Sequence, residues 1–350
     1  MSAHSHGVVH LVGSIPLDNA ENVFRTVAGA VPDHLARLPD GETGERIGWI
    51  RFMQEMLANH PDMEEDPDTP PLKWTQWDGV LLREIPQYRF RPGTDLSAVT
   101  FNTPYGDEAI ASFELFGRLQ DDGVIPSGTK FQVSIPTPLA PGYNYVAPGA
   151  QDDFIEVYTR HVVETVERIS AALPNDRIAF QWDVCQEVLM WEGYYDVQPA
   201  DYKEEIFRVL GEVGDAVPEP AELGYHLCYG SPRDEHLVQP RDSANMVEMT
   251  NGIVASISRS VQFIHLPVPK DRSDDAYFAA LAELKLPAGC DLYLGLIHHE
   301  DQAGDAARLA AAQKVVKVDG VSSECGWGRG DPERVPGLLA SHRKAAAALG

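Results

Sequence analysis

The stretch DDFIEVYTRHVVETVERISAALPNDRIAFQWD, residues 152–183, joins a helical pattern to an apolar strand pattern. Apolar residues recur at spacings of one, three and four from Asp153 to Leu173, which predicts an amphipathic helix with Asp152 as its N-cap. The run Ile178–Asp183 is mostly apolar, as expected of a strand that is buried on both faces. A helix that leads directly into such a strand is typical of an α/β protein.

The same alternation extends along the chain in both directions. Helical patterns also cover Ala200–Val213, Ala276–Leu284 and Ala303–Val316. Eight strands separated by helices predict a closed (β/α)8 TIM barrel, with an open doubly wound sheet as the alternative, and residues 1–350 as a single domain. The eight expected strands are Val8–Ser14, Leu35–Pro39, Lys130–Ile135, Ile178–Asp183, Leu223–Cys228, Val261–Leu266, Asp291–Ile297 and Gly320–Glu324.

Residues 59–128 interrupt this rhythm. The stretch is rich in Pro, Asp and Trp and contains the run PDMEEDPDTPP at 61–71. We interpret it as an insertion between the second and third strands that forms a lid or an interface. Its acidic run, Glu64 to Asp66, is expected to be a solvated surface rather than a cation site.

Composition narrows the class of protein. The 350 residues include 53 acidic and 28 basic side chains, for a formal net charge of -25, so there is no basic surplus to bind nucleic acid. No apolar run is long enough to span a membrane, and the N-terminus MSAHSHGVVH lacks the pattern of a secretory signal. Four scattered cysteines do not form a disulfide scaffold. These features predict a cytoplasmic enzyme.

Reactive side chains are concentrated where the expected strands end. Asp183, His226, His265, His298 and Cys325 all lie at or next to the carboxyl end of a strand. In a (β/α)8 barrel these ends meet at one rim, and that rim carries the active site. The residues are therefore expected to converge on one site.

His226-Leu227-Cys228 is the most informative segment of that rim. Residues two apart in a strand point to the same face, so both side chains can aim at one point. Alone, the pair is typical of a packed histidine and a buried thiol. Together with Cys325 it is a soft donor set that suits Zn²⁺ and leaves one coordination position open. A thiol that entered this position would lose its proton and stay nucleophilic, which suits alkyl transfer to sulfur.

Other polar residues of the rim have two interpretations. The loop that follows the second strand holds Asp40, Glu42 and Arg46, which either grip a polar substrate or form a plain turn. Arg329 follows the last strand and is expected to contact an anion. Cys185 lies two residues past Asp183 and is interpreted as a buried structural thiol.

Five short motifs, in order along nearly the whole chain, resemble the catalytic domain of cobalamin-independent methionine synthase, in the uroporphyrinogen-decarboxylase-like barrel group. They are Gly13-Ser14-Ile15-Pro16, Gln181-Trp182-Asp183, His226-Leu227-Cys228-Tyr229, Ile297-His298 and Glu324-Cys325-Gly326. The resemblance implies a (β/α)8 fold and zinc held by His226, Cys228 and Cys325. It also implies that Asp183 orients the acceptor and that His298 is an acid/base partner. We expect Ser14, Glu42 and Arg329 to join Asp183 in binding substrate.

The chain departs from the family at the sixth strand. A glutamate ligand of the family is replaced by His265, which is either a fourth zinc ligand or part of the pocket lining. We therefore expect a zinc-dependent methyl- or alkyltransferase acting on a small-molecule thiol, with a corrinoid or folate as the methyl donor. Two alternatives are a metal-independent lyase or decarboxylase on the same barrel, and a non-catalytic binding subunit for a corrinoid partner. Assembly into a homo-oligomer is compatible with all three.

Overall fold

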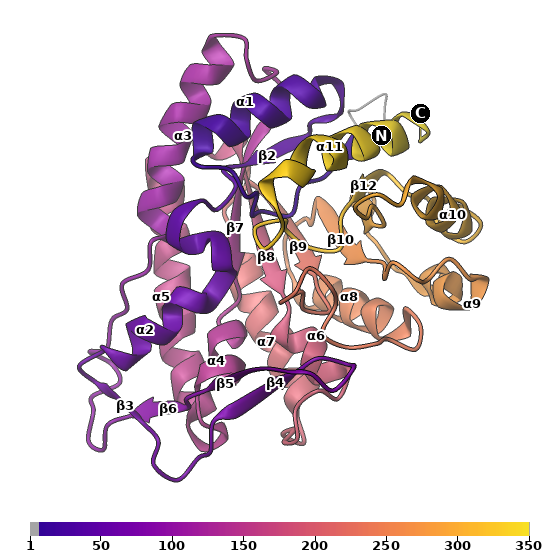
Figure 1. The fold of residues 1–350 in the computed structure, drawn as a ribbon. Helices are drawn as coiled ribbons and strands as arrows, with labels where there is room; N and C mark the ends of the chain where they lie inside the picture. The colour runs from indigo at the N-terminus through magenta and orange to yellow at the C-terminus, as the bar shows by residue number, and fades with distance from the viewer. Residues whose placement is uncertain (1–6, 350) are drawn as a thin grey trace.

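The computed structural model describes residues 7–349 and contains a curled sheet of eight parallel strands surrounded by helices (Figure 1). The strand order is β1-β12-β11-β10-β9-β8-β7-β2, so the first strand lies beside the last and the others follow in chain order. This is the order of a barrel, and a doubly wound sheet would instead reverse direction part-way. The strands are β1 Val8–Val9, β2 Arg37–Pro39, β7 Lys130–Pro136, β8 Ile178–Val184, β9 Glu222–Leu227, β10 Phe263–Pro267, β11 Asp291–Gly295 and β12 Gly320–Ser322.

All eight strands lie within or overlap the ranges predicted from the sequence. The largest difference is at the first, where only Val8–Val9 pair in the ladder although Val8–Ser14 is the expected strand. β1 and β2 are the two ends of the sheet. Just beyond them the Ile15 amide donates to the Gly41 carbonyl at 2.9 Å, which joins the two loops that follow these strands.

Amphipathic helices cover the outer face of the sheet. The opening stretch of the sequence forms α5, Gln151–Ala172, and its buried residues, Phe154 and Val166 among them, follow the predicted spacing. The predicted N-cap is wrong, because the helix begins at Gln151, two residues before the predicted start at Asp153, and Asp152 lies in its first turn. Its negative charge there still stabilises the helix, because it lies near the positive end of the helix dipole. The other long helices are α1 Ala20–Ala30, α3 Tyr105–Asp121, α7 Tyr202–Asp215, α8 Ala244–Ser256, α10 Gln302–Gln313 and α11 Val335–Ala347.

Shorter helices complete the connections between the strands. The predicted helix Ala276–Leu284 is present as α9, Asp275–Phe278, continued by the 3-10 helix η5, Ala279–Glu283. The remaining short elements are η1 Pro32–His34, α4 Leu139–Tyr145, η3 Pro148–Ala150, η4 Asn175–Arg177, α6 Gln186–Trp191 and η6 Pro332–Arg334.

The segment between β2 and β7 is more structured than its composition suggests. It holds η2 Gly44–Phe52, α2 Met53–Ala58, the antiparallel pair β3 Met63–Glu65 with β6 Tyr88–Phe90, and the antiparallel pair β4 Leu72–Thr75 with β5 Leu81–Ile85. Residues 59–128 also include α3, which packs on α1 and α5 as a covering helix. The acidic run is only partly solvated, because Glu64 pairs with Arg89 at 3.0 Å and Asp66 pairs with it at 3.2 Å.

The amino-terminal end of the sheet interior is filled by side chains. The Arg37 guanidinium lies 4.1 Å from the centre of the Phe263 ring and donates to the Tyr293 hydroxyl at 2.8 Å. Gly224 makes room for Phe263, since a Cβ at this glycine would lie 2.2 Å from the ring. With this end closed, open space inside the sheet is left toward the carboxyl ends of the strands.

No helix within residues 7–349 combines the length and the apolar content needed to cross a membrane. Residues 1–6, on which part of the prediction about a secretory signal rests, lie outside the described residues.

Candidate metal centre

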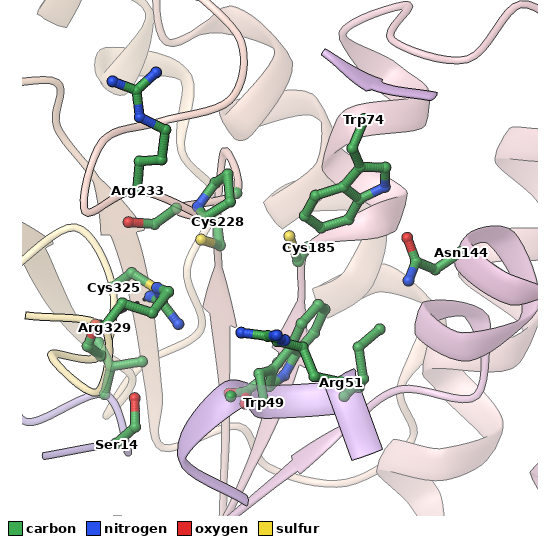
Figure 2. A pocket seen from close by; sticks show the side chains of 18 of the residues that line it. Ser14, Trp49, Arg51, Trp74, Asn144, Cys185, Cys228, Arg233, Cys325 and Arg329 are labelled. Atoms are coloured by element: carbon green, nitrogen blue, oxygen red, sulfur yellow. Dashed lines mark hydrogen bonds between the residues drawn. The ribbon is translucent and has the colours of Figure 1, made fainter. Parts of the chain in front are cut away.

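Three predicted ligands converge at the carboxyl end of the sheet. His226 lies in β9, Cys228 follows that strand directly, and Cys325 lies three residues past the end of β12. One ligand atom from each residue lies within 4.8 Å of the others. Within residues 7–349 no other set of His, Cys, Asp or Glu side chains forms such a group. Figure 2 shows the two cysteines on the same side of a cavity.

The strand geometry explains this convergence. His226 and Cys228 are two residues apart, so the alternation of side chains along β9 sends both toward the interior. The Cys228 amide donates to the Val184 carbonyl of β8 at 3.0 Å, which extends the strand alignment past the formal end of β9. Asp183 of β8 and His265 of β10 are the register partners of His226, and they therefore point to the same interior.

The electrostatics of the three donors suit a soft cation. Burial lowers the pKa of His226 to about 4, so its imidazole is neutral and keeps a lone pair for a metal. Contact with Cys185 and burial raise the pKa of Cys228, whereas contact with Cys228 and burial raise the pKa of Cys325. Cys228 therefore opposes the ionisation of Cys325, and a divalent cation between the two sulfur atoms would remove that penalty. A neutral imidazole and two cysteines fit zinc.

His265 lies behind His226 and outside the group of three. Its Nδ1 is 2.6 Å from the Nδ1 of His226, and the residue is completely buried. This contact occupies one ring nitrogen of His226 and leaves Nε2 for the cysteine side. His265 is also absent from the lining of the cavity. His265 therefore contacts the predicted ligand His226 and does not join the group of three predicted ligands.

A cavity of about 380 Å³ opens beside the three donors. This volume is in the usual range for a small-molecule site. All four predicted substrate-binding residues line it, namely Ser14, Glu42, Asp183 and Arg329.

Two buried carboxyl groups form part of this lining. Burial raises the pKa of Asp183 to about 7, although Gln181 Nε2 donates to its Oδ1 at 2.9 Å. Burial, and next the charge of Asp183, raise the pKa of Glu42. Glu42 has a positive φ of 48°, which is uncommon outside glycine. Gly13 is needed beside it, because a Cβ there would lie 1.9 Å from Glu42 Oε1.

The neighbours of Glu42 in the same loop have a structural role. Arg46 Nη2 lies 2.8 Å from Asp40 Oδ2, and both side chains are buried. Neither residue lines the large cavity. Of the three residues considered for gripping substrate, only Glu42 faces it.

Ser14 contacts the loop that follows β12, and Arg329 belongs to that loop. Ser14 Oγ accepts from the Gly328 amide at 3.3 Å, and its carbonyl accepts from the Trp327 amide at 2.6 Å. Arg329 Nη2 donates to Cys325 Sγ at 3.2 Å. A guanidinium this close to a cysteine sulfur favours the thiolate form that a metal ligand requires.

His298 does not line the cavity. Its Nε2 is 2.9 Å from the Val268 carbonyl, and its Nδ1 is 4.0 Å from Glu324 Oε2. The other oxygen of Glu324 is 3.5 Å from His236 Nδ1. Glu324 precedes Cys325 directly, so the two histidines flank the carboxylate next to a predicted ligand. The sequence analysis placed Glu324 in a motif without giving it a role, and it missed His236.

The opposite side of the cavity comes from residues that the sequence did not indicate. Two tryptophans and two arginines on the segment between β2 and β7 line it together with Ile50 and Leu82, and Asn144, Tyr145 and Cys185 add to them. Cys185 is buried, as predicted, but faces this space. The four are Trp49, Arg51, Trp74 and Arg83.

No family model and no curated protein matches the sequence. Solved structures do match. A B12-independent methionine synthase from Shewanella sp. W3-18-1, in complex with selenomethionine, aligns with a TM-score of 0.61 at 13% identity over 98% of this chain and 96% of that chain. The chain has the fold of this methionine synthase. A putative vitamin-B12 independent methionine synthase from Listeria monocytogenes aligns with a TM-score of 0.60 at 13% identity, over 100% of this chain and 99% of that chain. The resemblance to methionine synthase predicted from the motifs is confirmed for the fold.

Proposed function

We propose that this chain is a zinc-dependent transferase that moves a methyl or other alkyl group onto a small-molecule thiol. One observation carries the proposal: His226, Cys228 and Cys325 place their donor atoms within 4.8 Å of one another at the wall of a substrate-sized cavity. The methionine synthase fold of the structural neighbours supports the same reaction class.

Zinc would supply a Lewis acid that ionises the substrate thiol and keeps its sulfur nucleophilic. The other requirements are met by the chain itself. Arg329 contacts Cys325 Sγ and balances the negative charge of the donor set. Ser14, Glu42 and Asp183 line the adjacent wall, where they can hydrogen-bond to the acceptor and fix its orientation.

The proton released by the thiol needs an acceptor near the centre. We assign this task to His298 together with Glu324, whose closest atoms are 4.0 Å apart. Burial lowers the pKa of His298, so its imidazole is neutral and able to accept a proton, and the charge of Glu324 would stabilise the cation formed.

We also propose that the whole chain is one domain with a closed (β/α)8 barrel. The part of residues 59–128 that carries β4 and β5 would be the lid of this barrel. Trp74 of β4 and Arg83 of β5 line the cavity directly. A lid of this kind would exclude water from the ionised sulfur.

Elemental analysis of the purified protein, combined with a thiol alkylation assay, tests the proposal. We expect one zinc per chain, and consumption of thiol with a methylcorrinoid or a methylated folate as donor. Cys325→Ser should lower both the zinc content and the rate of thiol consumption. Cys290→Ser should change neither quantity, because Cys290 precedes β11 and does not line the cavity. A zinc-free wild-type protein that decarboxylates or cleaves its substrate would replace this proposal with the lyase alternative.

A further inference from the structure

The Arg308 side chain is among the largest that are completely buried in this protein. It lies on α10, which joins β11 to β12 and packs between α9 and α11 (Figure 1). A charged group with only 1% exposure requires partners that offset its loss of water. Arg308 does not line the cavity, so any effect that it has on the reaction passes through another residue.

Every nitrogen of the Arg308 guanidinium has a hydrogen-bond acceptor. Nε donates to the Leu296 carbonyl at 2.8 Å, and Nη1 donates to the Lys270 carbonyl. Nη2 donates to Asp305 Oδ1 at 2.6 Å and to Asp301 Oδ2 at 2.9 Å. The two acids and the arginine are four and three residues apart, so α10 presents them on one face. That face is directed at the loops that follow β10 and β11.

These contacts join the two loops that hold His298. Lys270 lies two residues past Val268, and the Val268 carbonyl oxygen is 2.9 Å from His298 Nε2. The His298 amide donates at 3.0 Å to Asp305 Oδ1, the oxygen that Arg308 also contacts. Arg308 is therefore connected to the backbone of this histidine through Asp305, and to the partner of its ring through the loop after β10.

The Val268 carbonyl determines which ring nitrogen of His298 carries a hydrogen. A carbonyl oxygen can only accept, so Nε2 carries the hydrogen of the neutral ring and Nδ1 keeps the lone pair. Nδ1 is also the atom that lies 4.0 Å from Glu324 Oε2. If the two loops moved apart, the ring would lose the contact that selects this tautomer. The position of the proton-accepting nitrogen thus depends on how firmly the loops are joined.

The demands on position 308 are specific to arginine. The planar guanidinium has donors in fixed directions and reaches two carbonyls and two carboxylates at once. A lysine would keep the positive charge, but its single ammonium on a flexible stem does not hold such a geometry. Asp305 is 4% exposed, and its Oδ2 has no hydrogen-bond partner among the described residues, so this carboxyl group relies on Arg308 and the His298 amide.

We propose that Arg308 is a positioning residue for the transfer reaction, because with Asp305 it joins the two loops that orient His298 and so keeps Nδ1 of that ring as the proton-accepting atom. This inference rests on the proposed function, in which His298 together with Glu324 takes the proton of the substrate thiol. A catalytic group displaced by about 1 Å can slow a reaction about 100-fold. A contact network outside the cavity can therefore control kcat and leave zinc and thiol binding unchanged.

Nitrogen NMR of the zinc-loaded full chain with isotope-labelled histidine rings tests the inference. Two-bond hydrogen–nitrogen correlations distinguish the two neutral tautomers, and the His298 signals are those that His298→Ala lacks. We expect one tautomer, with hydrogen on Nε2, in the wild type and a mixture in Arg308→Lys. In the alkylation assay kcat of this variant should fall by up to about 100-fold, with zinc content and the KM for the thiol unchanged. Arg25→Lys, an exposed arginine on α1 that pairs with Glu21, is the matched control and should alter neither.

Asp301→Ala keeps the test decisive if position 308 does not tolerate lysine. It removes a partly exposed partner of Arg308 and should give the same mixture of tautomers to a smaller extent. Folded variants that keep the single tautomer, or that lose it without a fall in kcat, overturn the inference, as does a wild-type ring with its hydrogen on Nδ1. A wild type that binds no zinc or consumes no thiol is instead a failure of the proposed function, and it is recognised separately because the tautomer is measured without turnover.

Discussion

The Nδ1 atoms of His226 and His265 are 2.6 Å apart, completely inside the sheet. At this distance one nitrogen donates a hydrogen bond to the other, which fixes the tautomer and the ring orientation of both histidines. Metal-binding histidines commonly hold their second ring nitrogen in this way, and loss of the partner typically costs 10- to 100-fold in metal affinity. His265 thus supports the predicted ligand His226 from the strand position where the methionine synthase family has a ligand of its own.

We therefore predict that His265→Leu lowers zinc affinity about 10- to 100-fold, because it removes the partner of His226 Nδ1. His265→Asn keeps a polar atom near the same position and should recover part of the loss. Competition with a chromophoric chelator measures both affinities, and thermal unfolding of the metal-free proteins controls for misfolding. Equal affinities in the Leu and wild-type proteins would show that the contact does not support the metal site.

Gly13 and Glu42 should be coupled energetically. A Cβ at position 13 would lie 1.9 Å from Glu42 Oε1, so Gly13→Ala forces the carboxyl group to move. We expect a loss of about 1–3 kcal/mol in the free energy of unfolding, measured in urea. In a Glu42→Ala background, where the clashing group is gone, the same change should cost much less. Additive effects of the two substitutions would contradict this packing.

The raised pKa of Asp183 predicts the direction in which the free energy of unfolding changes with pH. Its folded-state pKa is about 7 against an ordinary value of 3.8, so the folded protein binds its proton more tightly than the unfolded chain. This group therefore favours folding at low pH, and its contribution is lost as the pH rises from about 4 toward 7. Asp183→Asn should flatten that decline in the metal-free protein. Urea denaturation at a series of pH values measures the free energy of unfolding of both proteins. If the variant and the wild type show the same pH dependence, the raised pKa of Asp183 is refuted.

His298 is expected to affect turnover more than metal binding. His298→Ala removes the proton acceptor that we assign beside Glu324, and should lower kcat by about 100-fold or more while zinc content stays normal. His342→Ala, a buried histidine that does not line the cavity, is the control for general loss of a core imidazole. Full activity in the His298 variant would contradict this assignment, because another group would then have to accept the proton of the substrate thiol.

The parts of this structure that could be predicted are those with a local signal. Apolar runs such as Ile178–Asp183 indicate buried strands, because helices and the sheet interior cover both faces. The alternation of side chains in β9 is enough to put His226 and Cys228 on one face. The rule that carboxyl ends meet at one rim then brings in Cys325, although it is distant in sequence.

Other features have no local signal. The contact of His265 with a ligand depends on ring orientation and on the register of β10 against β9, which the sequence pattern does not specify. Arg51 and Arg83 belong to a segment without regular periodicity, so nothing linked them to the cavity. The N-cap prediction for α5 was wrong because acidic residues suit both the cap and the first turn of a helix.

X-ray absorption spectroscopy at the zinc edge tests the central claim most directly. The account predicts two sulfur ligands at about 2.3 Å and at least one nitrogen at about 2.0 Å in the protein as loaded, with a third sulfur when a thiol substrate is added. A first shell of only nitrogen and oxygen, or one that a thiol leaves unchanged, would contradict it.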